Sequence, residues 1–294
     1  MPIFFRIYND KLFPINEVET LGFNITDPSY IPTEYLERQE FVIIRTCFGI
    51  GDWGILSAMP RMLKKKYPNC KVYLPSDKLL DTIFGPEFKN QWGTWANPYD
   101  NMRYVFDNNP YVDGYVDSVA GEVYNDHFRL AIKEEEPLVR QMLRFWQFSE
   151  DEMEDAELFP ELYFTEEEEK FGRDIIDEYG GNLGFFGTLL VSDRFINDAN
   201  SNAKIQTILD NYKDLPYFYW LTTPDISLEF KRGLNLRHIH PRVQLYLKTM
   251  AFVNIGNQSG MNDTIAQYAT TYSIVRDKDG RLGTNIVTCQ RYVK

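Results

Sequence analysis

Three glycines and one acid surround a predicted turn near residue 50. Gly49, Gly51 and Gly54 are spaced as G-x-G-x-x-G, and Asp52 stands between the second and third glycine. Glycines at such a turn let backbone N–H groups approach a ligand closely. The Asp52 carboxylate can accept hydrogen bonds from backbone amides. These residue types suit either a phosphate-binding turn or a tight turn that starts a helix.

A strand and a helix must position this turn. The apolar run Phe41–Arg45 predicts a buried strand before it, and Trp53–Lys66 has helical spacing after it. Further strands are predicted at Lys71–Leu74, Met102–Asp107, Leu183–Val191, Tyr217–Leu221, Leu234–Ile239, Phe252–Ile255 and Tyr272–Val275, and further helices at Ser76–Phe84, Glu134–Phe148, Glu166–Tyr179, Ala203–Tyr212, Arg242–Met250 and Gly260–Ala269. This alternation predicts an α/β fold with parallel sheets covered on both faces.

The composition divides the chain into two domains and an extension. Acidic Ser149–Glu157 followed by Pro160 marks a boundary, because residues of this kind pack thinly. We therefore expect two Rossmann-like domains facing a cleft, over residues 41–158 and 159–294. Residues 1–40 are expected to pack on the first domain as an extension, with an edge strand through Phe4–Tyr8.

Charge and hydropathy exclude several classes of protein. A net charge of −12 and a pI near 4.8 disfavour a nucleic acid or an anionic membrane as the main partner. No stretch approaches the roughly 18 to 20 apolar residues of a membrane-spanning helix, so no integral membrane segment is expected. The N-terminus does not resemble a signal peptide, and Cys47, Cys70 and Cys289 suit reduced core thiols rather than a disulfide or a metal site. We expect a cytoplasmic protein.

The glycine turn has two interpretations that need no further motif. In the first it binds a dinucleotide, with Asp77 near the end of the next strand as the ribose ligand. Against this, Asp52 would repel a pyrophosphate, and Pro60 would bend the helix that has to pack on the sheet. In the second, Asp52 is the N-cap of its helix, and the glycines only permit a tight turn.

A third interpretation comes from a resemblance. Val42–Pro68 resembles the opening of the ADP-heptose:lipopolysaccharide heptosyltransferases, glycosyltransferase family 9. The shared residues are Arg45, Gly49, Gly51, Asp52, Pro60, Leu63, Lys64, Lys65, Tyr67 and Pro68. Asn109–Asp113 and Phe252–Met261 resemble two later turns of the same family. The three matches lie in the family's order.

The resemblance implies a GT-B fold and a reaction that needs neither a metal nor a cofactor. It makes 41–158 the acceptor domain, with Asp52 as the general base and with Gly49 and Gly51 beside it. It makes 159–294 the donor domain, which binds a nucleotide-sugar co-substrate. The residues expected to contact the donor diphosphate are Asn257, Ser259, Gly260, Met261, Arg194 and Thr223. The acceptor is expected to be a glycan or a lipopolysaccharide-like molecule.

Two residues depart from the family pattern. Gln258 stands where the family has Asp, and Asp263 stands where it has His. The resemblance as a whole implies a metal-independent, inverting glycosyltransferase. Because of the two departures, ADP-heptose is not assumed as its donor. A non-catalytic GT-B protein that binds nucleotides or glycans is the first alternative, and an NAD-dependent oxidoreductase is the second.

Overall fold

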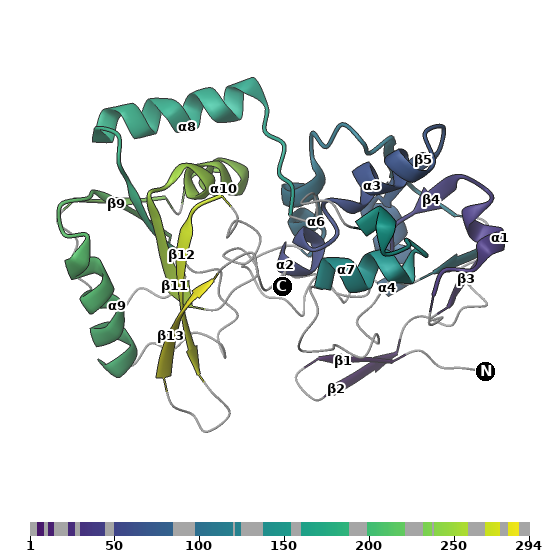
Figure 1. Ribbon diagram of the computed structural model, residues 1–294, viewed down its shortest axis with the longest axis horizontal. Coiled ribbons are helices and arrows are strands. Elements are labelled where there is room, and N and C mark those ends of the chain that lie inside the picture. The colour runs from purple at the N-terminus through teal and green to yellow at the C-terminus, as the bar shows by residue number, and fades with distance from the viewer. Residues whose placement is uncertain are drawn as a thin grey trace. The chain divides into compact units, whose positions relative to one another are not determined.

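The chain divides into two compact units. Unit 1 holds Met1–Leu158 with Tyr292–Lys294, and unit 2 holds Phe159–Arg291 (Figure 1). The computed structural model describes residues 5–8, 11–14, 23–26, 30–44, 50–84, 98–119, 121–124, 138–153, 160–187, 199–220, 232–236, 238–257, 268–276 and 282–287. The predicted helix Gly260–Ala269 lies largely outside these residues. Each unit is described by itself below.

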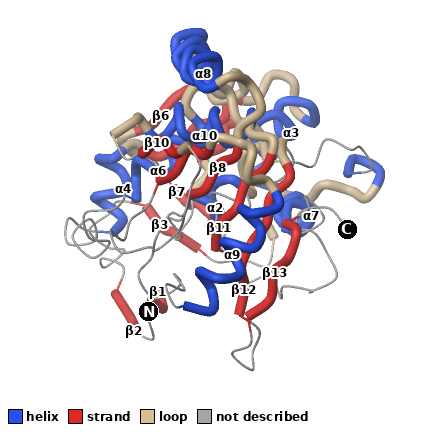
Figure 2. The backbone as a smooth tube through the Cα atoms, turned by 90° about the vertical axis from the view of Figure 1, so that its left-hand side faces the viewer, coloured by secondary structure: helices blue, strands red, loops and turns tan. Residues whose placement is uncertain are grey.

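Unit 2 is built on a six-stranded sheet of order β10-β9-β8-β11-β12-β13. The first five strands in this order are parallel, and β13 pairs antiparallel with β12. The strands are β8 (Gly184–Gly187), β9 (Tyr217–Trp220), β10 (Gly233–Asn235), β11 (Val253–Asn257), β12 (Thr270–Arg276) and β13 (Leu282–Val287). Figure 2 shows β11, β12 and β13 side by side. The parallel strands confirm the predicted Rossmann-like sheet.

Two helices cover opposite faces of this sheet. Val253 and Ile255 of β11 pack with Ile205 and Leu209 of α9 (Ala199–Asn211). Because side chains alternate along a strand, Asn254 points to the other face, where its side-chain amide donates to the carbonyl of Lys248 at 3.0 Å. Lys248 belongs to α10 (Pro241–Met250), on which α8 (Glu166–Tyr179) packs. The central strand is therefore covered on both faces, as the alternation predicted.

Helix α8 has the ends that its sequence predicts. At its start, the Thr165 hydroxyl accepts from the Glu168 N–H, and the Glu168 carboxylate accepts from the Thr165 N–H. At its end, Gly180 adopts a φ of 88°, a left-handed conformation that glycine adopts without strain. The acidic first turn therefore stabilises the start of a helix rather than forming a site.

Unit 1 has a smaller sheet, in which β4, β5 and β6 are parallel and lie in chain order. A parallel pair β3-β7 and an antiparallel hairpin β1-β2 accompany it. The strands are β1 (Phe5–Tyr8), β2 (Lys11–Pro14), β3 (Phe23–Thr26), β4 (Glu40–Val42), β5 (Lys71–Pro75), β6 (Gly114–Val116) and β7 (Gly121–Tyr124). Among the described residues, the helices are α1 (Thr33–Leu36), α2 (Ile50–Gly54), α3 (Met59–Lys66), α4 (Asp77–Phe84), α6 (Pro98–Phe106) and α7 (Leu138–Phe145), and a 3₁₀ turn lies at Asp151–Met153.

Aromatic packing accounts for much of the core of unit 1. Phe41 of β4 meets the Trp146 ring edge-on at a centroid distance of 5.7 Å, and Tyr35 lies within 6.3 Å of both rings. The Tyr35 hydroxyl accepts from the N–H of Val42 at 2.9 Å, so the cluster also fixes β4. Such pairs add to the burial of apolar area. The high aromatic content of the chain therefore serves packing here.

Two local predictions were wrong. Met102–Asp107 was expected to be a strand but lies mostly in α6, because Tyr99, Met102 and Phe106 are buried at helical spacing. The predicted helix Trp53–Lys66 is interrupted after Gly54, and Pro60 stands in the first turn of α3, where a missing N–H costs nothing. The strand expected through Phe4–Tyr8 is present as β1, where it pairs with β2 in a hairpin.

Candidate active site

The carboxyl edge of the unit 2 sheet has the topology of a ligand site. After β8 the chain forms β9 and then β10 on one side, and it then returns to form β11 on the other side of β8. The strand order therefore reverses between β8 and β11. In open α/β sheets, ligands bind outside the carboxyl ends of the strands at such a point. Here those ends are Gly187 and Asn257.

Strand pairing and close packing hold β8 and β11 side by side. Val253 of β11 lies opposite Gly184 of β8, and Ile255 lies opposite Phe186. A Cβ on Gly184 would overlap the buried ring of Tyr217, so this position accepts only glycine without a shift of the ring. On its other side, β11 is paired with β12 along its whole length, up to Asn257 opposite Ile274. Strand β11 is therefore paired on both sides up to Ile255, and its carboxyl end at Asn257 is paired with β12.

One predicted donor residue lies within the described part of this edge. Asn257 is the last residue of β11, so its backbone stands at the carboxyl end of the sheet. The other predicted donor residues, Ser259, Gly260, Met261, Arg194 and Thr223, lie outside the described residues. In chain order, they follow the carboxyl ends of β11, β8 and β9.

The predicted general base stands inside a short helix of unit 1. Asp52 is the third residue of α2 and Gly51 the second, while Gly49 lies outside the described residues. An N-cap residue precedes the first helical residue, which here is Ile50, so the N-cap interpretation of Asp52 was wrong. Gly51 lies within the helix rather than in a loop before it.

Side-chain contacts anchor α2 and the turn that follows it. Trp53 is fully buried, and its ring meets that of Phe106 edge-on at 6.1 Å. The Ser57 hydroxyl donates to the carbonyl of Gly54 at 2.6 Å, and the Asn109 side-chain amide donates to the carbonyl of Ser57 at 3.2 Å. The backbone that carries Asp52 is therefore tied to α6 and to the turn that begins at Asn109.

The structure disfavours the dinucleotide interpretation of this turn. A pyrophosphate on a helix N-terminus needs the field of a helix of several turns, and α2 has only five residues. Asp77, the expected ribose ligand, stands in the first turn of α4 with its carboxylate 3.3 Å from the Arg103 guanidinium. Both features fit structural roles better than a nucleotide site.

Two of the family-like motifs meet in an ion-paired cluster. Asp113 lies 2.5 Å from the Lys64 ammonium and 2.9 Å from that of Lys71, and it accepts from the Val72 N–H at 2.8 Å. Burial alone would raise the pKa of the Asp113 carboxyl, but these hydrogen bonds outweigh it and lower that pKa to about 2. The cluster lies where β5 and β6 begin, at the edge opposite their carboxyl ends. It stabilises the fold of unit 1 rather than acting on a ligand.

A perturbed lysine of unit 2 also lies away from the carboxyl edge. Lys248 is fully buried, and burial lowers its pKa to about 7. A group of this kind is a candidate for function. Its carbonyl accepts from Asn254 near the start of β11, which places this part of α10 away from Asn257.

Neither a metal cluster nor a membrane span is found in the described ranges. Those residues contain no group of three or more His, Cys, Asp or Glu side chains that could hold a metal ion. No helix among them is both long enough and apolar enough to cross a bilayer.

Comparison with known proteins finds similarity in structure alone. No protein-family model matches the sequence, and no curated protein matches it either. The chain is similar to the structure of ADP-heptose lps heptosyltransferase II of E. coli, with a TM-score of 0.50 and 11% identity over 79% of this chain and 83% of that one. It is also similar to a glycosyl transferase family 9 structure from Veillonella parvula, with a TM-score of 0.52 and 10% identity over 79% and 80% of the two chains. The fold therefore resembles that of glycosyltransferase family 9 and is of the GT-B class, as the motifs predicted.

Proposed function

We propose that the protein is a metal-independent, inverting glycosyltransferase that uses a nucleotide-sugar donor. One observation carries the proposal: the sheet order of unit 2 reverses between β8 and β11, and the family-like segment Asn257–Met261 begins at the carboxyl end of β11. The likeness to the two transferase structures supports the same fold class. The E. coli enzyme is named for ADP-heptose, but Gln258 and Asp263 argue against transferring that donor to this chain.

The proposed donor site must neutralise a leaving diphosphate without a metal ion. Ser259, Gly260 and Met261 follow β11 and would offer backbone amides and one hydroxyl. Arg194 follows β8 and Thr223 follows β9, so each stands in the chain just after a carboxyl strand end. A guanidinium and aligned amides stabilise negative charge most where it develops in the transition state.

The proposed acceptor site is centred on Asp52 in α2. A sugar hydroxyl is a weak nucleophile, and a carboxylate that takes its proton as the new bond forms makes it a stronger one. Gly49 and Gly51 have no side chains to obstruct an approaching glycan. A single attack by the activated hydroxyl, with no covalent enzyme intermediate, inverts the anomeric carbon. The anchoring of α2 through Trp53 supports this role, because a general base has to be held in place.

Binding of nucleoside diphosphates tests the donor site. We expect at least one of ADP, GDP, UDP and CDP to bind in the presence of EDTA, measured by calorimetry. Arg194→Ala should weaken that binding about 10- to 100-fold, since a charge-assisted hydrogen bond is lost. Arg173→Ala is the matched control, because Arg173 is an exposed residue of α8 that pairs with Glu169. Binding of NAD without any nucleoside diphosphate would contradict the proposal.

Turnover tests the base. Asp52→Asn should lower kcat for sugar transfer or donor hydrolysis by about 100- to 10,000-fold, while diphosphate affinity stays unchanged. Asp174→Asn, which changes an exposed carboxylate on α8, should leave both quantities unaltered. An Asp52→Asn variant as active as the wild type would show that another group is the base.

The departures at Gln258 and Asp263 favour one second candidate. Replacing a family His by an Asp near a diphosphate adds negative charge where a donor needs positive charge. A non-catalytic protein of the same fold would tolerate that change. It would bind a nucleoside diphosphate in the panel above but would hydrolyse no sugar nucleotide.

A further inference from the structure

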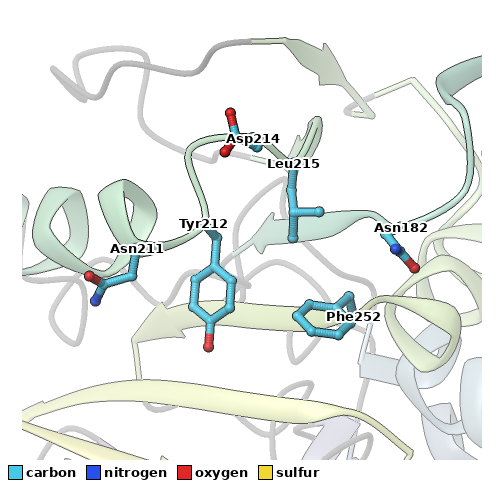
Figure 3. A pocket seen from close by; sticks show the side chains of 6 residues that line it. All are labelled: Asn182, Asn211, Tyr212, Asp214, Leu215 and Phe252. Carbon is cyan, nitrogen blue, oxygen red and sulfur yellow. The ribbon is translucent and has the colours of Figure 1, made fainter.

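A pocket opens at the edge of the unit 2 sheet opposite the proposed donor site. It lies where β8, β9 and β11 begin, and its volume is about 200 Å³. A strand rises about 3.3 Å per residue, so the five residues of β11 put the two edges about 15 Å apart. Six residues line the pocket: Asn182, Asn211, Tyr212, Asp214, Leu215 and Phe252 (Figure 3).

Backbone hydrogen bonds hold the walls of the pocket in place. The Phe252 N–H donates to the carbonyl of Leu183 at 2.7 Å, which joins the residues before β11 and β8. The Leu215 N–H donates to the carbonyl of Tyr212 at 2.9 Å, which closes the turn between α9 and β9. The lining is therefore preformed rather than assembled by a ligand.

Aromatic rings form the floor of the pocket. The Phe252 ring meets the Tyr212 ring edge-on at 6.1 Å, and the Tyr212 hydroxyl lies 3.0 Å from that of Tyr272 on β12. The hydrogen bond to Tyr272 and burial both raise the pKa of Tyr212, so its hydroxyl stays neutral at physiological pH. Phe252 is nevertheless 57% exposed, which is unusual for a side chain packed against other rings.

Polar side chains surround this apolar floor. Figure 3 shows Tyr212, Leu215 and Phe252 grouped in the middle, with Asn182, Asn211 and Asp214 around them. Each asparagine offers two N–H donors and a carbonyl acceptor, and neither is buried. An apolar floor with a few polar groups at its rim is the usual form of a small-molecule site. The volume is below the roughly 300–1,000 Å³ of sites for drug-sized ligands, so it suits a single ring.

We propose that this pocket is a saccharide-binding site that holds one pyranose unit of a glycan, away from the donor site. The C–H face of a pyranose would stack on the exposed Phe252 ring, beside the edge-on ring of Tyr212, and its hydroxyls would bond to the exposed side chains of Asn182 or Asn211. An exposed aromatic ring with polar side chains around it fits this class of ligand, whose two faces are apolar and whose rim is polar. The inference does not rest on the proposed transferase activity, since a non-catalytic protein could bind a glycan in the same way.

Titration of the full chain with defined sugars tests the site. The probes are chitotetraose, cellotetraose and maltotetraose, followed through the methyl NMR signals of Leu215 and by calorimetry, with and without a saturating nucleoside diphosphate. We expect at least one probe to shift the Leu215 methyls, with a Kd that the nucleotide does not change. Phe252→Ala should weaken this binding at least about tenfold, as removal of a central aromatic contact does.

Two variants make the result specific. Phe171→Ala removes another half-exposed phenylalanine of unit 2, on α8 and away from the pocket, and should leave sugar affinity unchanged. Asn182→Leu keeps the apolar floor but removes one amide, and should weaken sugar binding while the melting temperature stays the same. Thermal melting of Phe252→Ala confirms that this exposed truncation leaves the fold intact.

Several outcomes would overturn the proposal. If a broad glycan array together with the three probes shows no binding that depends on Phe252, the pocket is not a saccharide site. If Phe171→Ala weakens binding as much as Phe252→Ala does, the sugar binds elsewhere. If Phe252→Ala alters self-association in sedimentation while no sugar binds, the face is a contact between copies of the chain. Diphosphate binding at the opposite edge is measured separately, so its failure would not affect these outcomes.

Discussion

Asp113 is a single residue whose carboxylate connects several parts of unit 1. Its three hydrogen bonds connect the end of α3, the start of β5 and the residue before β6. Its pKa falls to about 2 in the folded protein from an ordinary value of 3.8, so the folded state favours the charged form. The stabilisation from Asp113 is therefore fully present above about pH 4 and is lost as the pH falls through about 2.

Asp113→Asn should remove this pH dependence. We expect the variant to unfold about 1 kcal/mol more easily at pH 7, a reduced figure because solvent screens the exposed Lys71 partner. The difference from wild type should shrink as the pH falls from 4 to 2, in urea denaturation followed by circular dichroism. Asp174→Asn, which breaks an exposed i,i+4 pair on α8, is the control and should change stability little. A pH-independent difference for Asp113→Asn would contradict the assignment.

At the same scale, local rules can account for single residues. The caps Thr165 and Gly180 obey such rules, because their partners lie within a few residues. The contact of Lys64 with Asp113 joins positions 49 residues apart, and no local pattern predicts such a pair. Asp52 was assigned by resemblance, and the pattern predicted a helix from Trp53, whereas α2 already begins at Ile50.

Among the elements, the packing of α8 on α10 depends on one small residue. A Cβ on Gly172 would overlap the ring of Tyr246, which is itself edge-on to Phe164 at 5.3 Å. At the start of both helices, the buried Arg242 guanidinium lies 2.6 Å from the Glu168 carboxylate. This ion pair leaves α8 little freedom to move away and make room for a larger residue at position 172.

Gly172→Ala should therefore destabilise the protein, although alanine is the better helix former by about 1 kcal/mol. We expect a net loss of about 1–2 kcal/mol, because the added methyl group overpacks the contact. Adding Tyr246→Leu should recover part of the loss, since the smaller side chain leaves room for the methyl group. Thermal melting of the single and double variants measures both effects. A more stable single variant would mean that the Tyr246 ring moves aside easily.

The strands and helices were predictable where their patterns were long. Helix α8 was predicted with its observed bounds, and β5, β9 and α10 to within one residue at each end. The prediction failed at Met102–Asp107. In this six-residue segment every second residue, Met102, Tyr104 and Phe106, is apolar or aromatic, and such alternation also fits a strand. Only the wider spacing from Tyr99 onward reveals the helix α6. It also failed to foresee β13, whose antiparallel pairing requires a partner strand rather than a pattern of its own.

For the whole molecule, the division into two units predicts which backbone amides a bound nucleotide protects from hydrogen exchange. The proposed donor site belongs to unit 2 alone, at the carboxyl ends of β8 and β11. A ligand that binds the folded state slows the opening of the elements that it contacts. A bound nucleoside diphosphate should therefore protect backbone amides of β8 and β11, and leave those of β4 and β5 unaffected.

Hydrogen exchange with mass spectrometry on the full chain measures this difference. The Arg194→Ala variant at the same nucleotide concentration serves as the control and should show less protection in unit 2. Protection concentrated in peptides that span Gly49 to Lys66 would point to phosphate binding at the glycine turn. That result would restore the dinucleotide interpretation.

The ion-paired cluster of unit 1 also constrains how related sequences can differ. Without the carboxylate at position 113, the positive charges of Lys64 and Lys71 would repel each other with no shared anion to compensate them. We therefore expect substitutions at 64, 71 and 113 to occur together among relatives, as correlated changes. Such a signal would identify chains that share the architecture of unit 1 even where the glycine turn has diverged.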